Sequence, residues 1–206
     1  MVHGPKEKKE RALGERLQVK GERCSSPKCA LVRKPFRPGV HGHSRQRKAL
    51  SEFGQQLKEK QKFKVYYGVG ERELRRIFER AAEKKGSTSA RLIELLERRL
   101  DNVIYRMGLA VSRSAAHQAI THGHILVNKR RVRSPGFLVS KGDEISIRPE
   151  SKPQGVFKEL SESLKKQEIP SWLSVDPLKV EGKVLEVPDD PALPFNVNFL
   201  IESFSK

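Results

Sequence analysis

Apolar residues in the first half of the chain recur at intervals of three and four, the period of helices that bury one face. The pattern predicts a basic helix at 51–68 and a cleaner amphipathic helix at 74–86. A long helix is expected at 88–108 and a short one at 112–123. Ser112 is a favourable N-cap for the short helix, because a serine hydroxyl accepts hydrogen bonds from the free amides of a first turn.

The period changes to two between residues 125 and 147, which predicts a small curled sheet. A further amphipathic stretch begins near Val156, followed by a strand-like segment at 184–187 and a final apolar run at 199–201. We therefore expect an α+β fold, with a helical first domain and an inserted module of two helices packed on a short antiparallel sheet.

The expected domains are a basic N-terminal arm at 1–50, a helical domain at 51–97 that residues 163–206 complete, and the inserted module at 98–162. The arm has no sustained apolar period and contains prolines and glycines among arginines and lysines. Such a segment gains too little burial to offset its ordering entropy, so we expect it to settle against a charged partner. The alternative is a disordered tail that only aids solubility.

The 206 residues include 42 Lys and Arg against 25 Asp and Glu, a net charge of +17. The excess is polarised: residues 1–50 carry 14 basic and 4 acidic side chains, whereas residues 151–206 carry 7 and 9. This favours a polyanionic partner, with nucleic acid ahead of a membrane. No apolar run approaches the roughly 20 residues that cross a bilayer, and no secretory signal is visible, so we expect the cytoplasm.

The region 98–148 carries the densest functional signal. The expected helix start at Ser112 and Arg113 offers free amides and positive charge, and the loop after Asn128 is expected to bring its cations beside it. A phosphate would then be bound both by the helix start and by the cations of this loop. Lys129 follows Asn128 where a glycine would suit a type I′ turn, which argues against that turn but adds a cation.

This region closely resembles the RNA-binding module shared by ribosomal protein four of the small subunit, some pseudouridine synthases, a heat-shock ribosome-binding protein and tyrosyl-tRNA synthetases. The resemblance rests on Arg99-Leu100-Asp101, Ser112-Arg113, His122-Gly123-His124-Ile125, Val127-Asn128 and Gly142-Asp143. Residues 20–42 and 51–86 also resemble the bacterial small-subunit protein, so the likeness covers nearly the whole chain.

The resemblance implies a structural constituent of the small ribosomal subunit. It implies a primary binder of ribosomal RNA that organises a multi-helix junction early in assembly. The implied neighbours are small-subunit protein five, at an interface linked to decoding accuracy, and protein three, beside the channel through which messenger RNA enters. Arg45, Arg47 and Lys48 would be the cations that face the messenger.

The other expected RNA-binding residues are cations, histidines and polar groups along the arm, the first helices and the module. They are Lys20, Arg23, Lys28, Arg33, Lys34, Arg37, His41, Lys58, Lys60, Lys62, Arg75, Arg76, Ser112, Arg113, His117, His122, His124, Asn128, Lys129, Arg130, Arg131 and Arg133. Aromatic residues are few, so we expect reading of backbone shape more than stacking, with Phe36 the exposed stacking candidate and Phe78, Phe157 and Trp172 in the core.

We expect no enzyme, cofactor or metal. The histidines have no nucleophile with an acid–base partner, and phosphate-loop and dinucleotide motifs are missing. Cys24 and Cys29 invite a metal site, since some family members hold one with four cysteines, and His41 or His43 would complete it. We expect instead that both cysteines are reduced, free thiols. The remaining alternatives are an RNA-modifying enzyme that uses the module as an anchor, and a stand-alone binding factor that rescues stalled ribosomes or represses a messenger.

Overall fold

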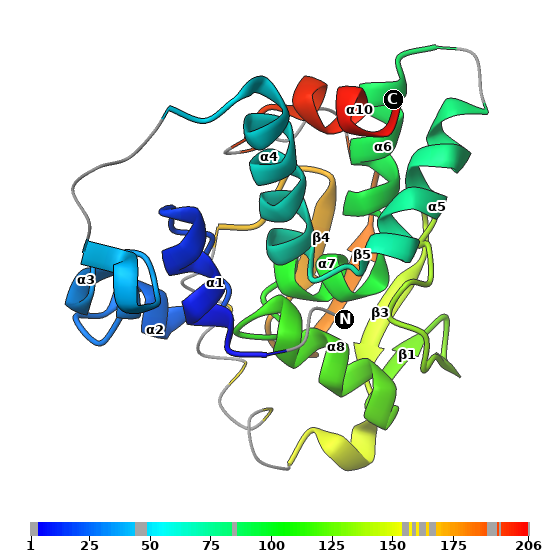
Figure 1. Ribbon diagram of the computed structural model, residues 1–206. Coiled ribbons are helices and arrows are strands. Elements are labelled where there is room, and N and C mark those ends of the chain that lie inside the picture. Colours follow the sequence, from blue (N-terminus) through cyan, green and yellow to red (C-terminus); the bar gives the residue numbers. More distant parts are fainter. Residues whose placement is uncertain are drawn as a thin grey trace. The chain divides into compact units, whose positions relative to one another are not determined.

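The computed structural model describes residues 4–43, 49–83, 86–153, 157, 160, 164, 168–188, 193 and 195–205. The chain divides into two compact units (Figure 1). The first comprises residues 1–92 with 191–206, and the second comprises residues 93–190. The fold is α+β, as the sequence predicts, with a helical N-terminal region and a five-stranded antiparallel sheet with helices.

The first unit is helical. Its elements are α1 (Lys6–Leu13), α2 (Glu22–Ser25), α3 (Ala30–Arg33), the 3-10 turn η1 (Val40–His43), α4 (Glu52–Tyr67), α5 (Glu71–Ala82) and α10 (Val197–Ser205). Ser51 caps α4 by accepting a hydrogen bond from the Gly54 amide, and Gly68 ends it with a φ of 69°, a conformation that costs glycine little. Helix α6 (Thr88–Glu97) crosses the division between the units.

The N-terminal segment is more ordered than its sequence suggests. Helix α1 packs against α3 and α4, and Leu13 and Leu17 form a small core with Val65. Only three apolar side chains of the segment take part in that core or line it, too few to give a visible helical period. The described part of the expected arm therefore contains helices, and α1 packs on α4.

The C-terminal helix packs on the first helices. Helix α10 contacts α4 and α5, the ring of Phe204 stacks on Phe78 at 5.0 Å, and Gln56 donates a hydrogen bond to Glu202 (Figure 1). All of residues 163–206 were expected to complete this domain. In the structure the strands at 173–184 pair with the sheet instead, because apolar residues there alternate with polar ones and match its buried face.

The second unit contains α7 (Leu100–Arg106), α8 (Arg113–His122), the 3-10 turn η2 (Pro149–Ser151) and five strands. The strands are β1 (Ile125–Val127), β2 (Arg130–Arg131), β3 (Glu144–Ile147), β4 (Leu173–Asp176) and β5 (Glu181–Val184), in the order β2-β1-β3-β5-β4. The strand expected at 184–187 lies at Glu181–Val184. Helices α7 and α8 share one core with the strands, and Leu160, Leu164 and Trp172 are buried in it.

The prediction of one long helix at 88–108 is wrong. The helical conformation is interrupted between α6 and α7. Arg99 has extended backbone, with φ −65° and ψ 135°, and forms an isolated antiparallel bridge with Leu138. The Leu100 amide donates to the Phe137 carbonyl, and the Val139 amide donates to the Arg98 carbonyl. Hydrogen bonds to residues 137–139, about forty positions further along the chain, replace those of a continuous helix. The local pattern of apolar residues gives no sign of these distant partners.

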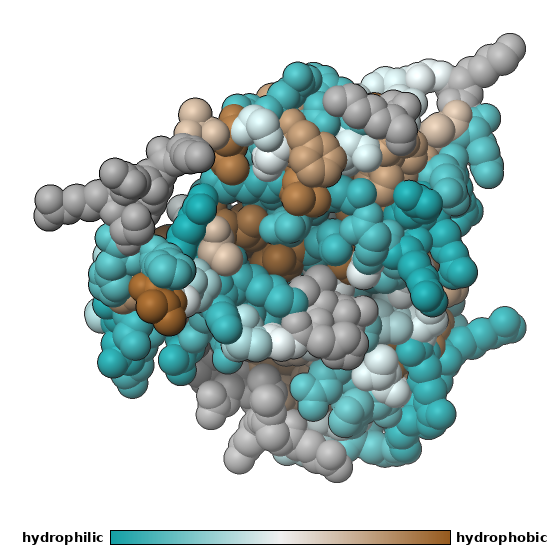
Figure 2. Space-filling model, in the orientation of Figure 1, coloured by the Kyte–Doolittle hydropathy of each residue, from teal (hydrophilic) through white to brown (hydrophobic). Residues whose placement is uncertain are grey.

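Hydrophilic residues cover most of the face drawn in Figure 2, as the high charge of the chain requires. Among the described residues, no helix combines the length and the apolar character needed to span a membrane.

Candidate nucleic-acid interface

The N-terminus of α8 has the form of an anion-binding helix start. Ser112 is its N-cap, and the serine hydroxyl accepts a hydrogen bond of 3.2 Å from the Ala115 amide. No acidic side chain lies in the first turn, and the first helical residue is Arg113. The positive end of the helix dipole therefore coincides with a guanidinium, which favours a phosphate there.

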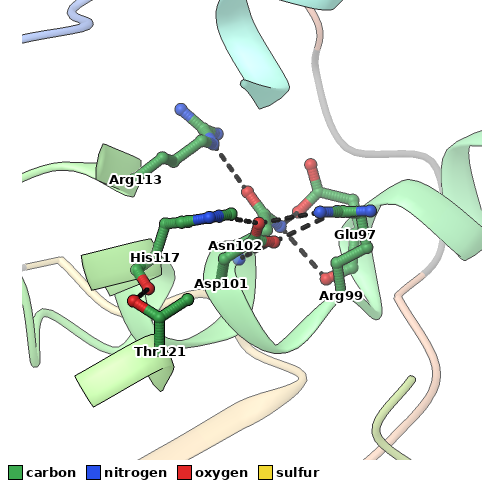
Figure 3. A network of polar contacts seen from close by, with 7 residues as sticks. All are labelled: Glu97, Arg99, Asp101, Asn102, Arg113, His117 and Thr121. Atoms are coloured by element: carbon green, nitrogen blue, oxygen red, sulfur yellow. Dashed lines mark hydrogen bonds and ion pairs between the residues drawn. The ribbon is translucent and has the colours of Figure 1, made fainter. Parts of the chain in front are cut away.

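Arg113 is held in place by a chain of polar contacts beneath it (Figure 3). Its Nε donates to Asn102 Oδ1 at 2.8 Å, and Asn102 Nδ2 donates to the carboxylate of Glu97 at 2.8 Å. Arg106 donates to both Glu97 oxygens, and Glu97 is fully buried. The guanidinium of Arg113 also lies 4.4 Å from the Tyr105 ring centroid. A side chain fixed on two sides loses less entropy when it binds a ligand.

A second buried pair lies beside the first (Figure 3). Arg99 donates to both oxygens of Asp101, at 3.1 and 2.8 Å, and His117 Nδ1 lies 3.7 Å from the same carboxylate. Burial alone would raise the pKa of Asp101, but His117 and Arg99 outweigh it and hold the pKa below its usual value. His117, expected to bind RNA, is thus engaged with a buried carboxylate.

The turn between β1 and β2 differs from expectation. Asn128 and Lys129 both have positive φ, 49° and 64°, the combination that a type I′ turn requires, so a lysine in place of glycine does not exclude that turn. Asn128 holds the turn by donating to Asp143 and accepting from the Glu144 amide. A lysine in this conformation costs about 1 kcal/mol relative to glycine, and the structure gives the exposed Lys129 no internal role that offsets it.

Cations and histidines gather at the C-terminal end of α8. Arg131 Nη2 donates to the His122 carbonyl at 3.1 Å, and a Cβ on Gly123 would lie 2.2 Å from Arg131 Nε. The rings of His122 and His124 are 6.0 Å apart, and His124 Nδ1 lies 2.9 Å from the hydroxyl of Ser151. Gly123 is therefore favoured by its φ of 78°, and it leaves space in which the Arg131 guanidinium approaches the backbone.

The positive groups in this cluster repel one another. Desolvation, followed by the charges of Arg133 and Arg148, lowers the pKa of Arg131, although a guanidinium stays protonated in water. Desolvation and then the charges of His122, Arg148 and Arg131 lower the pKa of His124. Arg148 itself pairs with Glu150. Crowded positive groups of this kind are stabilised by a bound polyanion.

The two candidate phosphate-binding elements lie at opposite ends of α8. The cations after Asn128 were expected beside Ser112, whereas Arg131 contacts His122 and Gly123 at the far end of the helix. Ten residues at 1.5 Å each separate the two ends by about 15 Å. Two clusters at this spacing suit two separate stretches of a folded RNA backbone better than one phosphate gripped from both sides.

Three lysines predicted to bind RNA are engaged within the protein. Lys58 and Lys62 form ion pairs with Glu15, and Lys62 also pairs with Glu59, while Lys60 pairs with Glu71. Lys62 is 5% exposed.

The remaining predicted residues of the first unit are exposed: Lys20, Arg23, Lys28, Arg33, Lys34, Arg37, His41, Arg75 and Arg76. Arg23 pairs with Glu7 at 2.7 Å. Arg45, Arg47 and Lys48 lie outside the described residues.

Sequence reasoning missed the residues that position Arg113, namely Glu97, Asn102, Tyr105 and Arg106. Glu97 directly follows Leu95 and Leu96, Asn102 directly precedes Val103 and Ile104, and both polar residues are buried. A polar residue inside an apolar face is a usable signal, because such groups need hydrogen-bonding partners when they are buried.

Both cysteines are buried free thiols. Burial raises the pKa of Cys24, and the Cys24 sulfur lies 3.8 Å from a carboxylate oxygen of Glu10. Glu10 also accepts hydrogen bonds from the Leu17 and Val19 amides, so its role in holding this loop is structural. Within the described part of the chain, no group of three metal-binding side chains is assembled.

The Asn102 contact gives a direct test of how Arg113 is positioned. We expect Asn102→Ala to weaken RNA binding several-fold, because the Arg113 guanidinium loses its fixed acceptor. In a double-mutant cycle of RNA affinities, the same change should have little effect once Arg113 is alanine. Additive losses would show that Asn102 acts on RNA binding independently of Arg113.

Comparison with known proteins identifies the class of protein to which this chain belongs. The model "Ribosomal protein S4/S9 N-terminal domain" matches residues 1–97, and the model "S4 domain" matches residues 98–145. The class is thus a ribosomal protein that carries an RNA-binding S4 domain, and α8 with the β1–β2 turn lies inside that domain.

The relatives identify the family within this class. The chain is 46% identical over 198 residues to small ribosomal subunit protein uS4 of Thermus thermophilus, covering 95% of this chain and 94% of the relative. The values are the same for the uS4 protein of Acetivibrio thermocellus. The chain belongs to the uS4 family of the small ribosomal subunit. It is an RNA-binding structural protein of the ribosome and not an enzyme.

Proposed function

We propose that the chain is a primary binder of small-subunit ribosomal RNA that nucleates assembly of the body of the subunit. The observation that supports this most is the placement of cations at the two ends of α8, where Arg113 donates to Asn102 at one end and Arg131 donates to the His122 carbonyl at the other. A preorganised interface binds its RNA without help from other proteins, because little ordering cost remains.

Chemical footprinting of naked small-subunit RNA tests this proposal. With the protein as the sole addition, protection should cluster at one multi-helix junction. After assembly, the protein should stay at about one copy per subunit through a high-salt wash. Dispersed protection, or binding only when other ribosomal proteins are present, would contradict the role of a primary binder.

The proposed neighbours are small-subunit proteins five and three. The contact with protein five would influence decoding accuracy, and protein three would share the channel through which messenger RNA enters, with Arg45, Arg47 and Lys48 facing the messenger. Substituting these three by Ala should lower crosslinking of messenger RNA to this protein in assembled ribosomes. Ribosomal-RNA binding should change much less, because the α8 clusters remain.

We further propose that His124 contributes a proton-dependent contact. Its pKa is lowered in the free protein, and a phosphate nearby would raise it by favouring the charged imidazolium. The bound form therefore holds more protons, so affinity should increase as the pH falls from about 7 through the ordinary histidine range near 6.5. His124→Gln should reduce this increase in titrations at several pH values. An unchanged pH profile would exclude His124.

A further inference from the structure

The first unit contains a cavity of about 480 Å³ beside the start of α1. Its charged lining consists of Lys6, Glu7, Lys8, Arg11, Lys20 and Lys34. Part of the remaining wall is apolar, formed by Pro5, Ala30, Phe36 and Pro38. The volume falls in the range of about 300–1,000 Å³ that is usual for sites of small organic ligands. None of the sequence patterns that indicate RNA binding singled out Lys6, Lys8 or Arg11.

The positive charges of this cavity are poorly compensated from within. Its one lining carboxylate, Glu7, accepts a 2.7 Å hydrogen bond from Arg23, which does not line the cavity. Burial, followed by the charges of Lys20 and Lys9, lowers the pKa of Lys6. Bringing the lysines together is thus unfavourable in the free protein, and an anion in the cavity would remove the cost.

The start of α1 adds to this charge. Its N-cap is Pro5, which forms no side-chain cap, and lysines occupy three of the first four helical positions. First turns normally favour acidic side chains, since the helix dipole is positive there. Lysines at this end therefore oppose helix stability, and they suit a site where an anion meets the free amides.

Arg11 fixes the far wall of the cavity. Its Nε donates to the Lys34 carbonyl at 3.0 Å, its Nη2 donates to the Phe36 carbonyl at 3.1 Å, and its guanidinium lies 5.0 Å from the Phe36 ring centroid. On the same segment, the Phe36 and His43 rings lie 3.7 Å apart. The wall is thus an aromatic and proline surface that the contacts of Arg11 hold in place.

We propose that this cavity binds one unpaired nucleotide of the RNA. Its phosphate lies against Lys6, Lys20 and the first amides of α1, and its base lies against the Phe36–Pro38 wall. Single-stranded nucleotides in folded RNA are recognised in this way, by backbone charge and a splayed base. The assignment rests on the proposed function, because it takes ribosomal RNA as the ligand.

The test compares two doubly substituted full-length chains with the parent in binding to small-subunit RNA over a range of salt concentrations. Lys6→Gln with Lys20→Gln removes two cations of the cavity. Arg16→Gln with Arg72→Gln removes two exposed cations of the same unit that do not line it. The cavity variant should bind on the order of tenfold more weakly near 0.1 M salt, and its salt slope should fall by about 0.7 to 0.9, the contribution of the one phosphate contact that is lost. The matched variant should change much less. Ultraviolet crosslinking should attach a nucleotide to the Phe36 peptide in the parent and in the matched variant, but not in the cavity variant.

The outcomes separate this inference from the proposed function. A parent chain that fails to bind ribosomal RNA would overturn the proposed function. A parent that binds while both variants weaken equally would overturn the cavity assignment alone. Adenosine monophosphate and inorganic phosphate, titrated onto the free chain, serve as the other probes. Saturable binding of either at the Lys6–Lys9 amides, with an RNA salt slope that the cavity variant leaves unchanged, would assign the cavity to a free metabolite and overturn its assignment to RNA.

Discussion

Replacing Arg130, Arg131 and Arg133 together by Ala is expected to weaken binding to small-subunit RNA by about two orders of magnitude near 0.1 M salt. Three phosphate contacts would be lost, so the salt slope should fall by about 2 to 2.7. All three side chains are exposed, and the described contacts give Arg131 a single bond within the protein, to the His122 carbonyl. Thermal unfolding of the free chain should therefore change little.

The matched control removes the same charge from other exposed positions of the second unit: Lys141, Lys179 and Lys183, each changed to Ala. If the cluster at the end of α8 positions the RNA, this control should retain most of the affinity and most of the slope. Equal losses in the two variants would mean that only total charge matters. The β1–β2 region would then have no particular role in RNA binding.

Helix α8 shows which features the sequence reveals well. Ser112 and Gly123 mark its two ends in the sequence, and in the structure they are its N-cap and C-cap. Both signals are local, because a cap depends on the chemistry of one residue and on amides within the next turn. The alternation that predicted β1 and β3 is equally local, since it reflects which side of a strand is buried.

Features that depend on distant partners could not be read in the same way. The break before Leu100 depends on hydrogen bonds to residues 137–139, and the addition of β5 to the sheet depends on pairing between Glu144 and Lys183. Lys58 and Lys62 appear free in the sequence, yet their partner Glu15 belongs to the loop after α1. The charge composition correctly predicted RNA as the partner. Which cations face the RNA depends on contacts between distant parts of the chain, such as these ion pairs.

The pairing of Arg99 with Asp101 predicts the largest loss of stability. We expect Asp101→Ala to lower the free energy of unfolding of the second unit by about 3–5 kcal/mol, since it removes the carboxylate that accepts two hydrogen bonds from the 3%-exposed Arg99. It also removes an acceptor from the Asn102 amide. Denaturant unfolding of the full chain without RNA measures this. Arg99→Met combined with Asp101→Leu should recover much of the loss, because no buried charge is then unpaired.

The pH dependence distinguishes this charge pair from simple packing. The folded-state pKa of Asp101 lies below its usual value, so the carboxylate stabilises the fold fully above about pH 4 and loses this contribution as the pH falls through the lowered pKa. Asp101→Asn has nearly the same shape and cannot titrate. Its unfolding free energy should be low at neutral pH and should approach that of the parent in acid. If the difference between the two proteins were constant from neutral pH to about pH 2, the ion pair would contribute nothing, and the loss would reflect packing alone.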